Sequence, residues 1–362
     1  MTAVPRVTFL VLPRLVGGGA ERQVRLLHDH LCANGHAVTV VVTEPETAAA
    51  FGAEVDWFAH ADVRRLTGPA RVAALLAVLD ERPATLLVLI NDRIAYRALG
   101  AVRARRPELR IVELVYGLDE RPATLMRSAS MVDATVVESE PVARPLRCIG
   151  RTVTVAPNGV DVDAFDPLRL SAVARGAIGL PRSAATIGFL GRLDPVKGAD
   201  VLLAAMSHAD WQDLDASVVI AGDGPQRGAL ERARRSLPSR LRRAVTMVGQ
   251  IADAPGFLAA CDVVVVPSRR DGRPNVVLEA MAAGRAVVAS RVGDIEAMLD
   301  GGRCGVLVPP SDAGALAGAI GGLLRDRAAM AGFGRAARER LVAEWPLART
   351  LPALAAAVTG GH

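Results

Sequence analysis

Short apolar runs alternate with longer segments of helical periodicity along the whole chain. In the first half, the apolar runs predict strands at 7–12, 37–42, 85–90, 110–115 and 134–137, with helices between them at 21–34, 69–79, 93–105 and 121–129. In the second half, strands are predicted at 186–190, 216–221, 245–248, 263–266, 286–289 and 305–308, and helices at 198–206, 226–236, 254–260, 276–283 and 315–324. Strands that are apolar throughout belong to parallel sheets covered on both faces by helices. We therefore expect an α/β protein with two Rossmann-like domains whose parallel sheets face each other across a cleft.

The length of 362 residues also favours two domains, because one hydrophobic core rarely serves a chain of this size. Segment 157–167 is rich in Pro, Asn, Gly and Asp, which is the composition of a joint. We expect an N-terminal domain of residues 1–160 and a C-terminal domain of residues 166–344. Ligands of such sheets bind at the carboxyl ends of the strands, so functional residues are expected in the loops that follow strands.

Composition points to a globular cytoplasmic protein. The chain is 51% hydrophobic and 22% charged, and no apolar run approaches the roughly 18 residues that span a bilayer. The N-terminus has no signal-peptide layout. The four cysteines are scattered without a C-x-x-C pair, so we expect them to be small core residues in a reducing compartment.

The net charge of +5 belongs to the C-terminal half. Residues 1–165 carry 19 Arg and 19 acidic residues, whereas residues 166–362 carry 24 basic and 19 acidic residues. Aromatic residues make up 3% of the chain and no basic stripe is interleaved with them, so nucleic acid is not an expected partner. The six histidines show no metal-ligand spacing, and no metal is expected.

One basic residue stands out. Lys197 is the only lysine among 43 Lys and Arg residues, and the two residue types differ most where a site needs a compact ammonium on a long stem. Lys197 and Arg192 lie between a predicted strand and a predicted helix, an arrangement suited to holding phosphate. The alternative is a lysine that has survived by chance on a solvated surface.

Three glycine-rich turns follow strands or the joint. The Gly-Gly-Gly-Ala-Glu sequence at 17–21 would let backbone amides approach an anion, although a third spaced glycine of the dinucleotide fingerprint is missing. Asn-Gly-Val-Asp at 158–161 and Gly-Asp-Gly-Pro at 222–225 are turn signals. Each of these segments, taken alone, is equally well explained as an ordinary turn between two elements of secondary structure.

A pair of carboxylates is the most specific feature. Asp271 lies in the loop after a strand, Pro274 suits the first turn of the next helix, and Glu279 falls inside that helix. Apolar neighbours make a solvated face a weaker explanation for Glu279. A buried carboxylate needs strong hydrogen-bond donors, and the paired hydroxyls of a sugar or ribose supply them.

These residues together resemble the retaining glycosyltransferases of family 4, which have the GT-B fold. The resemblance covers nearly the whole chain in the expected order: the first glycine loop at 17–21, the interdomain joint at 158–161, the diphosphate-binding Arg192 and Lys197, the G-D-G-P turn at 222–225, and the E-x7-E pair in Asp271 and Glu279. It also implies that a C-terminal helix within about 345–362 packs back on the N-terminal domain.

The resemblance implies roles for individual residues. Arg192, Lys197 and Asp271 would be catalytic: the first two hold the diphosphate of a nucleotide-sugar and Asp271 contacts a hydroxyl of its sugar. Glu279 would bind the ribose, and backbone near Gly249 and Ile251 the base. The donor-binding set is completed by Gly18, Gly19, Gly191, Gly272, Arg273, Pro274 and Asn275. No cofactor or metal is implied, because the basic pair takes the place of a metal ion.

Two departures from the family pattern concern the sugar end of the site. The first acid is Asp271, one methylene shorter than the usual Glu, so its sugar contact would shift or use water. Tyr116 stands where the family often has His before a glycine. Tyr116 would either hydrogen-bond donor or acceptor or close the pocket, and with Glu21 it forms the acceptor-side candidates.

The expected function is transfer of a sugar from a UDP- or GDP-sugar to a hydroxyl of a small-molecule, natural-product or glycan acceptor. Peripheral membrane contact is not favoured, because residues 1–165 have no net charge and their one basic cluster is Arg103, Arg105 and Arg106. Alternatives are a glycosyltransferase of lipid or polysaccharide precursors at the membrane surface, a phosphorylase or synthase, and a non-catalytic nucleotide-sugar-binding protein. A dehydrogenase or epimerase is disfavoured by the missing dinucleotide fingerprint.

Overall fold

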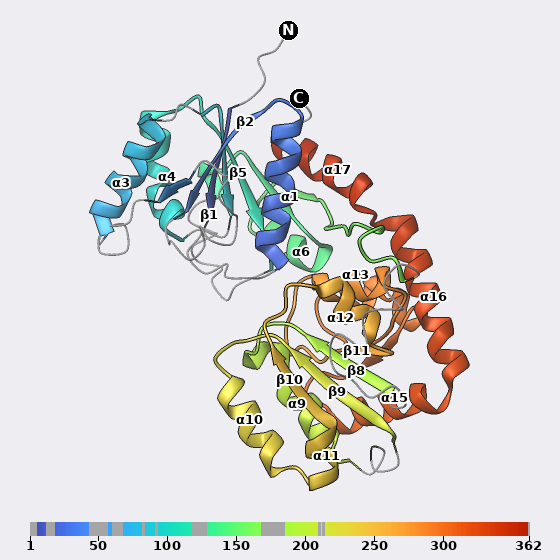
Figure 1. Cartoon of the computed structure of the whole chain (residues 1–362). Coiled ribbons are helices and arrows are strands. Elements are labelled where there is room, and N and C mark those ends of the chain that lie inside the picture. Colours follow the sequence, from blue (N-terminus) through green and yellow to red (C-terminus); the bar gives the residue numbers. More distant parts are fainter. Residues whose placement is uncertain are drawn as a thin grey trace. The chain divides into compact units, whose positions relative to one another are not determined.

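The protein consists of two compact units, Met1–Asn158 with Arg349–His362, and Gly159–Ala348. The computed structural model (Figure 1) describes residues 6–11, 19–42, 57–59, 68–81, 84–90, 93–117, 129–167, 185–208, 211 and 214–360. The chain passes from the first unit to the second after Asn158 and returns after Ala348.

The first unit contains a parallel sheet of seven strands in the order β3-β2-β1-β4-β5-β6-β7. The strands are β1 (Arg6–Val11), β2 (Ala37–Val42), β3 (Trp57–Ala59), β4 (Leu86–Ile90), β5 (Arg110–Val115), β6 (Ala134–Val137) and β7 (Val153–Val155). Every residue of β4 is buried, as expected for a central strand covered on both faces.

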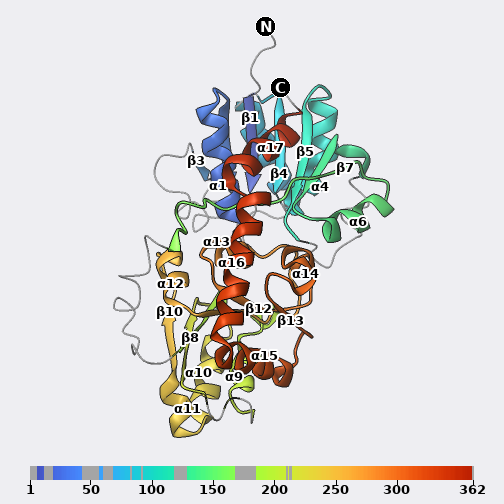
Figure 2. The same cartoon turned by 90° about the vertical axis from the view of Figure 1, so that its right-hand side faces the viewer.

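Helices cover both faces of this sheet (Figures 1 and 2). On one face α1 (Gly19–Ala33) and the C-terminal helix α17 (Leu347–Thr359) pack on a core that includes Leu27, Val112 and Leu354. On the other face, α3 (Gly68–Glu81) and α4 (Arg93–Arg105) pack on one cluster and α6 (Glu140–Cys148) packs on a second. The end of the chain therefore belongs to the N-terminal unit.

The second unit repeats the plan with six parallel strands in the order β10-β9-β8-β11-β12-β13. The strands are β8 (Ala185–Leu190), β9 (Ala216–Ala221), β10 (Val245–Gly249), β11 (Val263–Val266), β12 (Ala286–Ser290) and β13 (Val306–Val308). Its helices are η2 (Pro195–Lys197), α9 (Ala199–Ala205), α10 (Arg227–Ser236), α11 (Ser239–Ala244), α12 (Ala254–Ala260), α13 (Asn275–Ala282), α14 (Ile295–Met298), η4 (Asp300–Gly302), α15 (Ala313–Arg325) and α16 (Arg327–Glu344).

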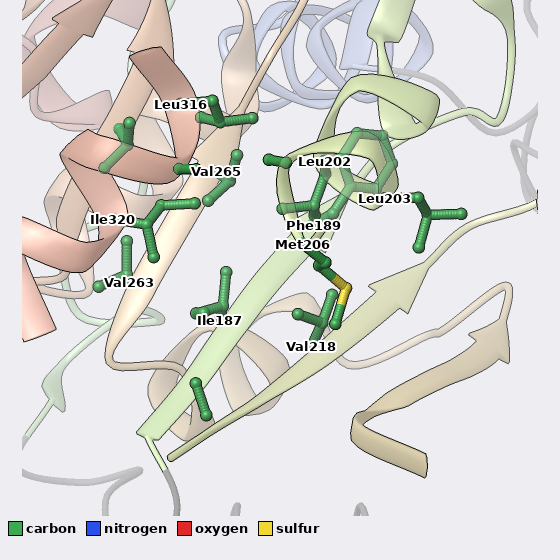
Figure 3. Close-up of a cluster of buried hydrophobic side chains, with 14 of the residues drawn as sticks. Ile187, Phe189, Leu202, Leu203, Met206, Val218, Val263, Val265, Leu316 and Ile320 are labelled. Atoms are coloured by element: carbon green, nitrogen blue, oxygen red, sulfur yellow. The ribbon is translucent and has the colours of Figure 1, made fainter. Parts of the chain in front are cut away.

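Alternate residues of each strand serve two separate cores. Figure 3 shows the core in which Ile187 and Val265 of the sheet meet Leu202 of α9 and Ile320 of α15. The opposite face packs against α12, α13 and α16. Gly188 points to that face, where a Cβ would lie 2.2 Å from the Cys261 sulfur, so the position needs a residue without a side chain.

The α/β fold with two Rossmann-like parallel sheets is confirmed, and several local expectations are corrected. Six elements were not predicted from the sequence; they are β3, α6, β7, α11, α14 and α16. Of the helix expected at 121–129, only Ala129 lies in the described part of the chain, where it begins the turn η1 (Ala129–Met131). The cysteines were expected in the core, but Cys32 and Cys148 are exposed on helices.

A buried ionic network lies on one face of the first sheet. The Glu113 carboxylate of β5 is fully buried and lies 2.5 Å from a nitrogen of Arg151, whose side chain is 1% exposed. The hydroxyls of Tyr96 and Thr135 donate to the same carboxylate. Burial raises the pKa of Glu113 even though the Arg151 guanidinium acts in the opposite direction.

We predict that Arg151→Met destabilises the protein by about 3–5 kcal/mol at neutral pH, because it leaves the Glu113 carboxylate buried without its cation. A carboxyl group whose pKa is higher in the folded state stabilises the fold below its unfolded pKa, and this contribution is lost as pH rises through the folded pKa. The loss in Arg151→Met should therefore shrink as pH falls toward the unfolded pKa of Glu113. Urea unfolding at several pH values measures this.

The matched control is Arg147→Met, which removes an exposed partner of Glu140. It should leave the free energy of unfolding close to that of the native protein, because solvent screens an exposed ion pair. The double variant Glu113→Leu/Arg151→Met should recover most of the lost stability, because a well-packed apolar pair can replace a buried ion pair. An Arg151→Met protein as stable as Arg147→Met would contradict this account of the network.

Candidate functional site

Strand order places the candidate site of the second unit. β8 lies between β9 and β11, so the connections after β8 and β11 leave in opposite directions along the sheet. Ligands of doubly wound sheets bind at the carboxyl ends of strands at such a switch point. Gly191 and Arg192 directly follow β8, and Ser268 follows β11. The loops that carry Arg192 and Asp271 therefore lie where this topology places a ligand.

Glycines let the loops after β8 and β9 approach each other. The Leu193 amide donates to the Asp223 carbonyl at 2.8 Å, and the Gln226 amide donates to the Leu193 carbonyl at 2.9 Å. A Cβ on Gly222 would lie 1.9 Å from the Gly191 carbonyl oxygen, and one on Gly224 would lie 2.5 Å from the Leu193 carbonyl oxygen. Both glycines have positive φ. Close packing against the Arg192 loop therefore requires glycine at both glycine positions of the Gly-Asp-Gly-Pro turn.

The turn that carries Lys197 is shaped by Asp194. One Asp194 carboxylate oxygen accepts from the backbone amides of Val196 at 3.0 Å and Lys197 at 3.2 Å. The other lies 2.5 Å from a nitrogen of Arg192, whose side chain is 62% exposed. Gly198 follows with φ of 71°, and a Cβ there would meet the Pro267 carbonyl at 2.0 Å. Asp194 therefore contacts the side chain of Arg192 and the backbone of Lys197, the two residues predicted to bind phosphate.

Lys197 and Asp271 meet directly. The Lys197 Nζ atom lies 2.7 Å from Asp271 Oδ2, and the Ser268 hydroxyl donates to the same oxygen at 3.1 Å. The side chains are 30% and 12% exposed, respectively. An ammonium and a carboxylate that remain partly accessible can exchange hydrogen bonds with a ligand that carries phosphate and hydroxyl groups.

Arg269, which the sequence analysis did not single out, joins the two loops from the outside. Its guanidinium makes a bidentate pair with Asp200 at 2.9 and 2.6 Å and donates to the Pro195 carbonyl. Its backbone amide donates to the Val196 carbonyl at 2.7 Å. The hydrogen bonds from Arg269 lower the pKa of Asp200. These contacts fix the Lys197 turn to the Asp271 loop.

The carboxylate loop leads into α13, which carries Glu279. Pro274 is the N-cap residue and Asn275 the first helical residue, so Pro274 lies one position before the expected first turn. Glu279 is 8% exposed. The Gly272 carbonyl accepts from the Asp294 amide at 2.8 Å, and the Arg273 guanidinium pairs with the Asp294 carboxylate. The Arg273 side chain is therefore paired with another group of the protein.

At the base end of the expected donor site, Gly249 ends β10 with a φ of 75°. Its carbonyl accepts from the Gly222 amide at 2.7 Å. Ile251 is partly buried against the core on the α13 face. Gly249 is therefore hydrogen-bonded to the loop that carries Asp223.

The acceptor-side candidates belong to the first unit. Tyr116 follows β5; its hydroxyl is buried, and burial together with the Glu138 carboxylate raises its pKa. Glu138 accepts from the Gly117 amide at 3.1 Å and from the Asn158 side-chain amide at 3.4 Å. The phenol of Tyr116 therefore stays neutral at physiological pH. Glu138 was not identified from the sequence.

The first glycine loop is described only in part. Gly17 and Gly18 lie outside the described residues, Gly19 begins α1, and Glu21 lies in α1 with a side chain outside the description. Among the residues that the structure covers, no group of three or more His, Cys, Asp or Glu side chains is placed to hold a metal ion. None of the described helices combines the length and apolar character needed to cross a bilayer.

The chain matches two known families of proteins. Residues 17–164 match the family described as Glycosyltransferase Family 4, and residues 184–326 match Glycosyl transferases group 1. The chain belongs to glycosyltransferase family 4. The two matches cover strands β2 to β13 and every loop that carries a predicted catalytic residue.

Sequence relatives are similar over part of their length. A D-inositol 3-phosphate glycosyltransferase of Corynebacterium urealyticum is 38% identical over 200 residues, which is 50% of this chain and 46% of that protein. A phosphatidyl-myo-inositol mannosyltransferase of Mycolicibacterium smegmatis is 37% identical over 200 residues, which is 54% of this chain and 49% of that protein. The matches thus span about half the length of these curated relatives.

Solved structures share the fold. A glycosyltransferase from Rickettsia africae matches with a TM-score of 0.83 and 18% identity, covering 99% of this chain and 100% of that one. The Anabaena protein Alr3699/HepE, solved in complex with UDP, matches with a TM-score of 0.81 and 19% identity, covering 98% and 100%. These likenesses confirm the GT-B architecture of this family member.

We predict that Gly222→Ala destabilises the protein and disturbs the Arg192 loop. A side chain at φ of 135° with a Cβ 1.9 Å from the Gly191 carbonyl forces backbone movement, and backbone strain alone costs on the order of 1–3 kcal/mol. Gly228→Ala is the control. Gly228 lies in α10, and a Cβ there would lie 3.6 Å from a guanidinium nitrogen of Arg232, which is an ordinary contact. This substitution should stabilise the protein by up to about 1 kcal/mol. Thermal unfolding that ranks Gly222→Ala equal to Gly228→Ala would refute the close-packing argument.

Proposed function

We propose that the protein is a retaining glycosyltransferase that moves a sugar from a nucleotide-diphosphate sugar to a hydroxyl group of a small acceptor molecule. The observation that carries this proposal is the meeting of Lys197 with Asp271 at the switch point of the second sheet, where Arg192 also lies. UDP- and GDP-sugars are the expected donors. The proposal is supported by membership of glycosyltransferase family 4.

In this proposal each charged residue contacts a different part of the donor. Lys197 and Arg192 hold the diphosphate and stabilise the negative charge that grows on it as the glycosidic bond breaks. Asp271, held by Ser268 as well as by Lys197, accepts a hydrogen bond from a sugar hydroxyl. Glu279, on α13, accepts from the ribose hydroxyls, while backbone at Gly249 and Ile251 takes the base.

The reaction proceeds with retention at the sugar carbon. The bond from this carbon to the leaving phosphate oxygen breaks, and the acceptor oxygen forms its bond on the same face. The acceptor proton passes to the leaving phosphate oxygen, so the products are the glycoside and a nucleoside diphosphate. Two fixed cations beside the phosphates supply the stabilisation that a metal ion gives in other enzymes.

The relatives support a nucleotide donor and a polyhydroxylated acceptor. Alr3699/HepE has been solved with UDP and with UDP-glucose. The sequence relatives include a D-inositol 3-phosphate glycosyltransferase and a phosphatidyl-myo-inositol mannosyltransferase. We propose a soluble acceptor, because residues 1–165 carry 19 basic and 19 acidic residues and so have no net positive charge that would attract an anionic membrane.

The proposal is tested by incubating the protein with UDP- and GDP-sugars, alone and with a set of soluble hydroxyl acceptors. Slow release of nucleoside diphosphate without acceptor, accelerated by one acceptor class, is the expected result. Binding without any turnover would instead favour a non-catalytic nucleotide-sugar-binding protein. Absence of both binding and turnover would reject the proposal.

We predict that Lys197→Ala lowers kcat by about 10²–10³, because it removes one electrostatic contact to the leaving group. Lys197→Arg should also lose substantial activity, since a planar guanidinium beside Arg192 cannot take the place of the ammonium. The control is the reverse exchange Arg303→Lys at a side chain that is 79% exposed, which should leave kcat unchanged. Full activity of Lys197→Arg in steady-state assays would contradict the special role of this lysine.

We predict that Glu279→Gln weakens binding of UDP by roughly 10- to 100-fold, because hydrogen bonds to a charged group contribute about 1.5–3 kcal/mol. Inorganic diphosphate, which has no ribose, should bind the variant and the native protein equally. Calorimetric titration compares the two ligands. Equal weakening of both would show that Glu279 acts through the fold and not on the ribose.

A further inference from the structure

The Arg273 side chain is enclosed although its backbone belongs to the carboxylate loop. The side chain is 3% exposed and pairs with the Asp294 carboxylate, which is 9% exposed. Two residues earlier, Asp271 binds Lys197 and Ser268. One short loop therefore presents a carboxylate to the candidate donor site and a guanidinium to the protein interior.

An aromatic ring lies against this guanidinium. The Arg273 guanidinium carbon is 4.4 Å from the centre of the Trp345 ring, and that of Arg340 is 5.2 Å from it. Trp345 is 9% exposed, so the cation–π contact with Arg273 is largely shielded from water. Arg340 contacts the ring from α16, where it also pairs with Glu344 at 3.0 Å.

Backbone contacts make the loop and the turn before α14 one rigid piece. The Asp294 amide donates to the Gly272 carbonyl at 2.8 Å. Gly293 has a φ of 55°, and a Cβ there would lie 2.0 Å from the Asp271 carbonyl oxygen. Movement of the Asp271 backbone therefore requires movement of Asp294, and with it of the guanidinium that Asp294 holds.

Trp345 lies at the end of the second unit where the chain turns back toward the first. Its carbonyl accepts from the Val160 amide at 3.2 Å, and the Leu347 amide donates to the Val160 carbonyl at 2.9 Å. Val160 and Pro346 form a parallel bridge. The two segments that connect the units are thus paired beside the ring on which Arg273 rests.

We propose that Arg273 is a positioning residue for Asp271, and that its contact with Trp345 transmits occupation of the donor site to the paired connecting segments. The inference rests on the proposed function, because it requires a nucleotide at Lys197 and Asp271. A ligand that displaces or tightens Asp271 shifts a loop that is fixed to Arg273, and the shift reaches Trp345 through the stacked guanidinium. Arg273 acts on the donor through the loop and not through its own side chain.

The test uses the full chain labelled with 5-fluorotryptophan, which gives resonances for Trp57, Trp211 and Trp345. Trp345→Phe identifies the Trp345 resonance. UDP and GDP are titrated while calorimetry measures their affinity for the same sample. We expect the Trp345 resonance to shift in proportion to saturation, and the resonance of Trp211, in the opposite core, to stay in place.

Arg273→Lys keeps the charge but removes the planar group that pairs and stacks, so it should weaken UDP binding about tenfold and abolish the Trp345 shift. Arg340→Lys is the matched control, because it replaces the other guanidinium on the ring by an ammonium and lies on α16, outside the carboxylate loop. It should leave UDP affinity within about twofold and preserve the shift. Trp345→Phe, which keeps a ring, should bind UDP more tightly than Trp345→Leu.

Tight UDP or GDP binding with an unmoved Trp345 resonance would overturn the inference while leaving the proposed function intact. Native affinity in Arg273→Lys would overturn it as well. A native protein that binds neither nucleotide would remove the proposed function and the inference together. Because the first measurement needs no substitution at Arg273, the outcome does not depend on whether that variant folds.

Discussion

The salt bridge between Lys197 and Asp271 joins the loops that follow β8 and β11, and the rest of the candidate site is arranged around it. An ammonium and a carboxylate in contact hold each other in place only if both loops are themselves fixed. Asp194 fixes the first loop through backbone amides, and Asp294 fixes the second through the Gly272 carbonyl. Arg269 then ties the loops together. Preorganisation of this kind lets charges act on a transition state without rearranging during the reaction.

The distribution of burial around this bridge separates the groups that we propose to bind the donor from the groups that hold the loops in place. Arg192 is mostly exposed and Lys197 partly so, whereas Arg273 and Asp294 are almost completely buried. A phosphate can compete for a cation that water already reaches. It cannot compete for a guanidinium enclosed by a carboxylate and an indole ring, because exposing that guanidinium would separate the buried Asp294 carboxylate from its cation. Sequence neighbours in one loop therefore have different roles.

The fold could be predicted from the sequence because continuous apolar strands and helical periodicity are local signals. Lys197, Asp271 and Glu279 could be selected because each stood out against its neighbours in charge or burial. Arg269 and Trp345 could not, since one more arginine among 42 and one tryptophan after a helix carry no local signal. Their roles arise from contacts between distant parts of the chain. Arg269, for example, pairs with Asp200, which lies 69 residues away in the sequence. The helix α6 escaped prediction because Pro145 interrupts its pattern.

The single lysine permits a direct measurement of the central claim, that Lys197 holds the donor diphosphate. Protein grown with lysine labelled with ¹⁵N at the side chain contains one labelled ammonium group, at Lys197. Its resonance can be followed while UDP, GDP or inorganic diphosphate is added. Our account predicts that the resonance shifts with saturation by the nucleotide and by diphosphate, because the phosphates replace or share the Asp271 contact. A resonance that stays unchanged while calorimetry shows the nucleotide bound would contradict it.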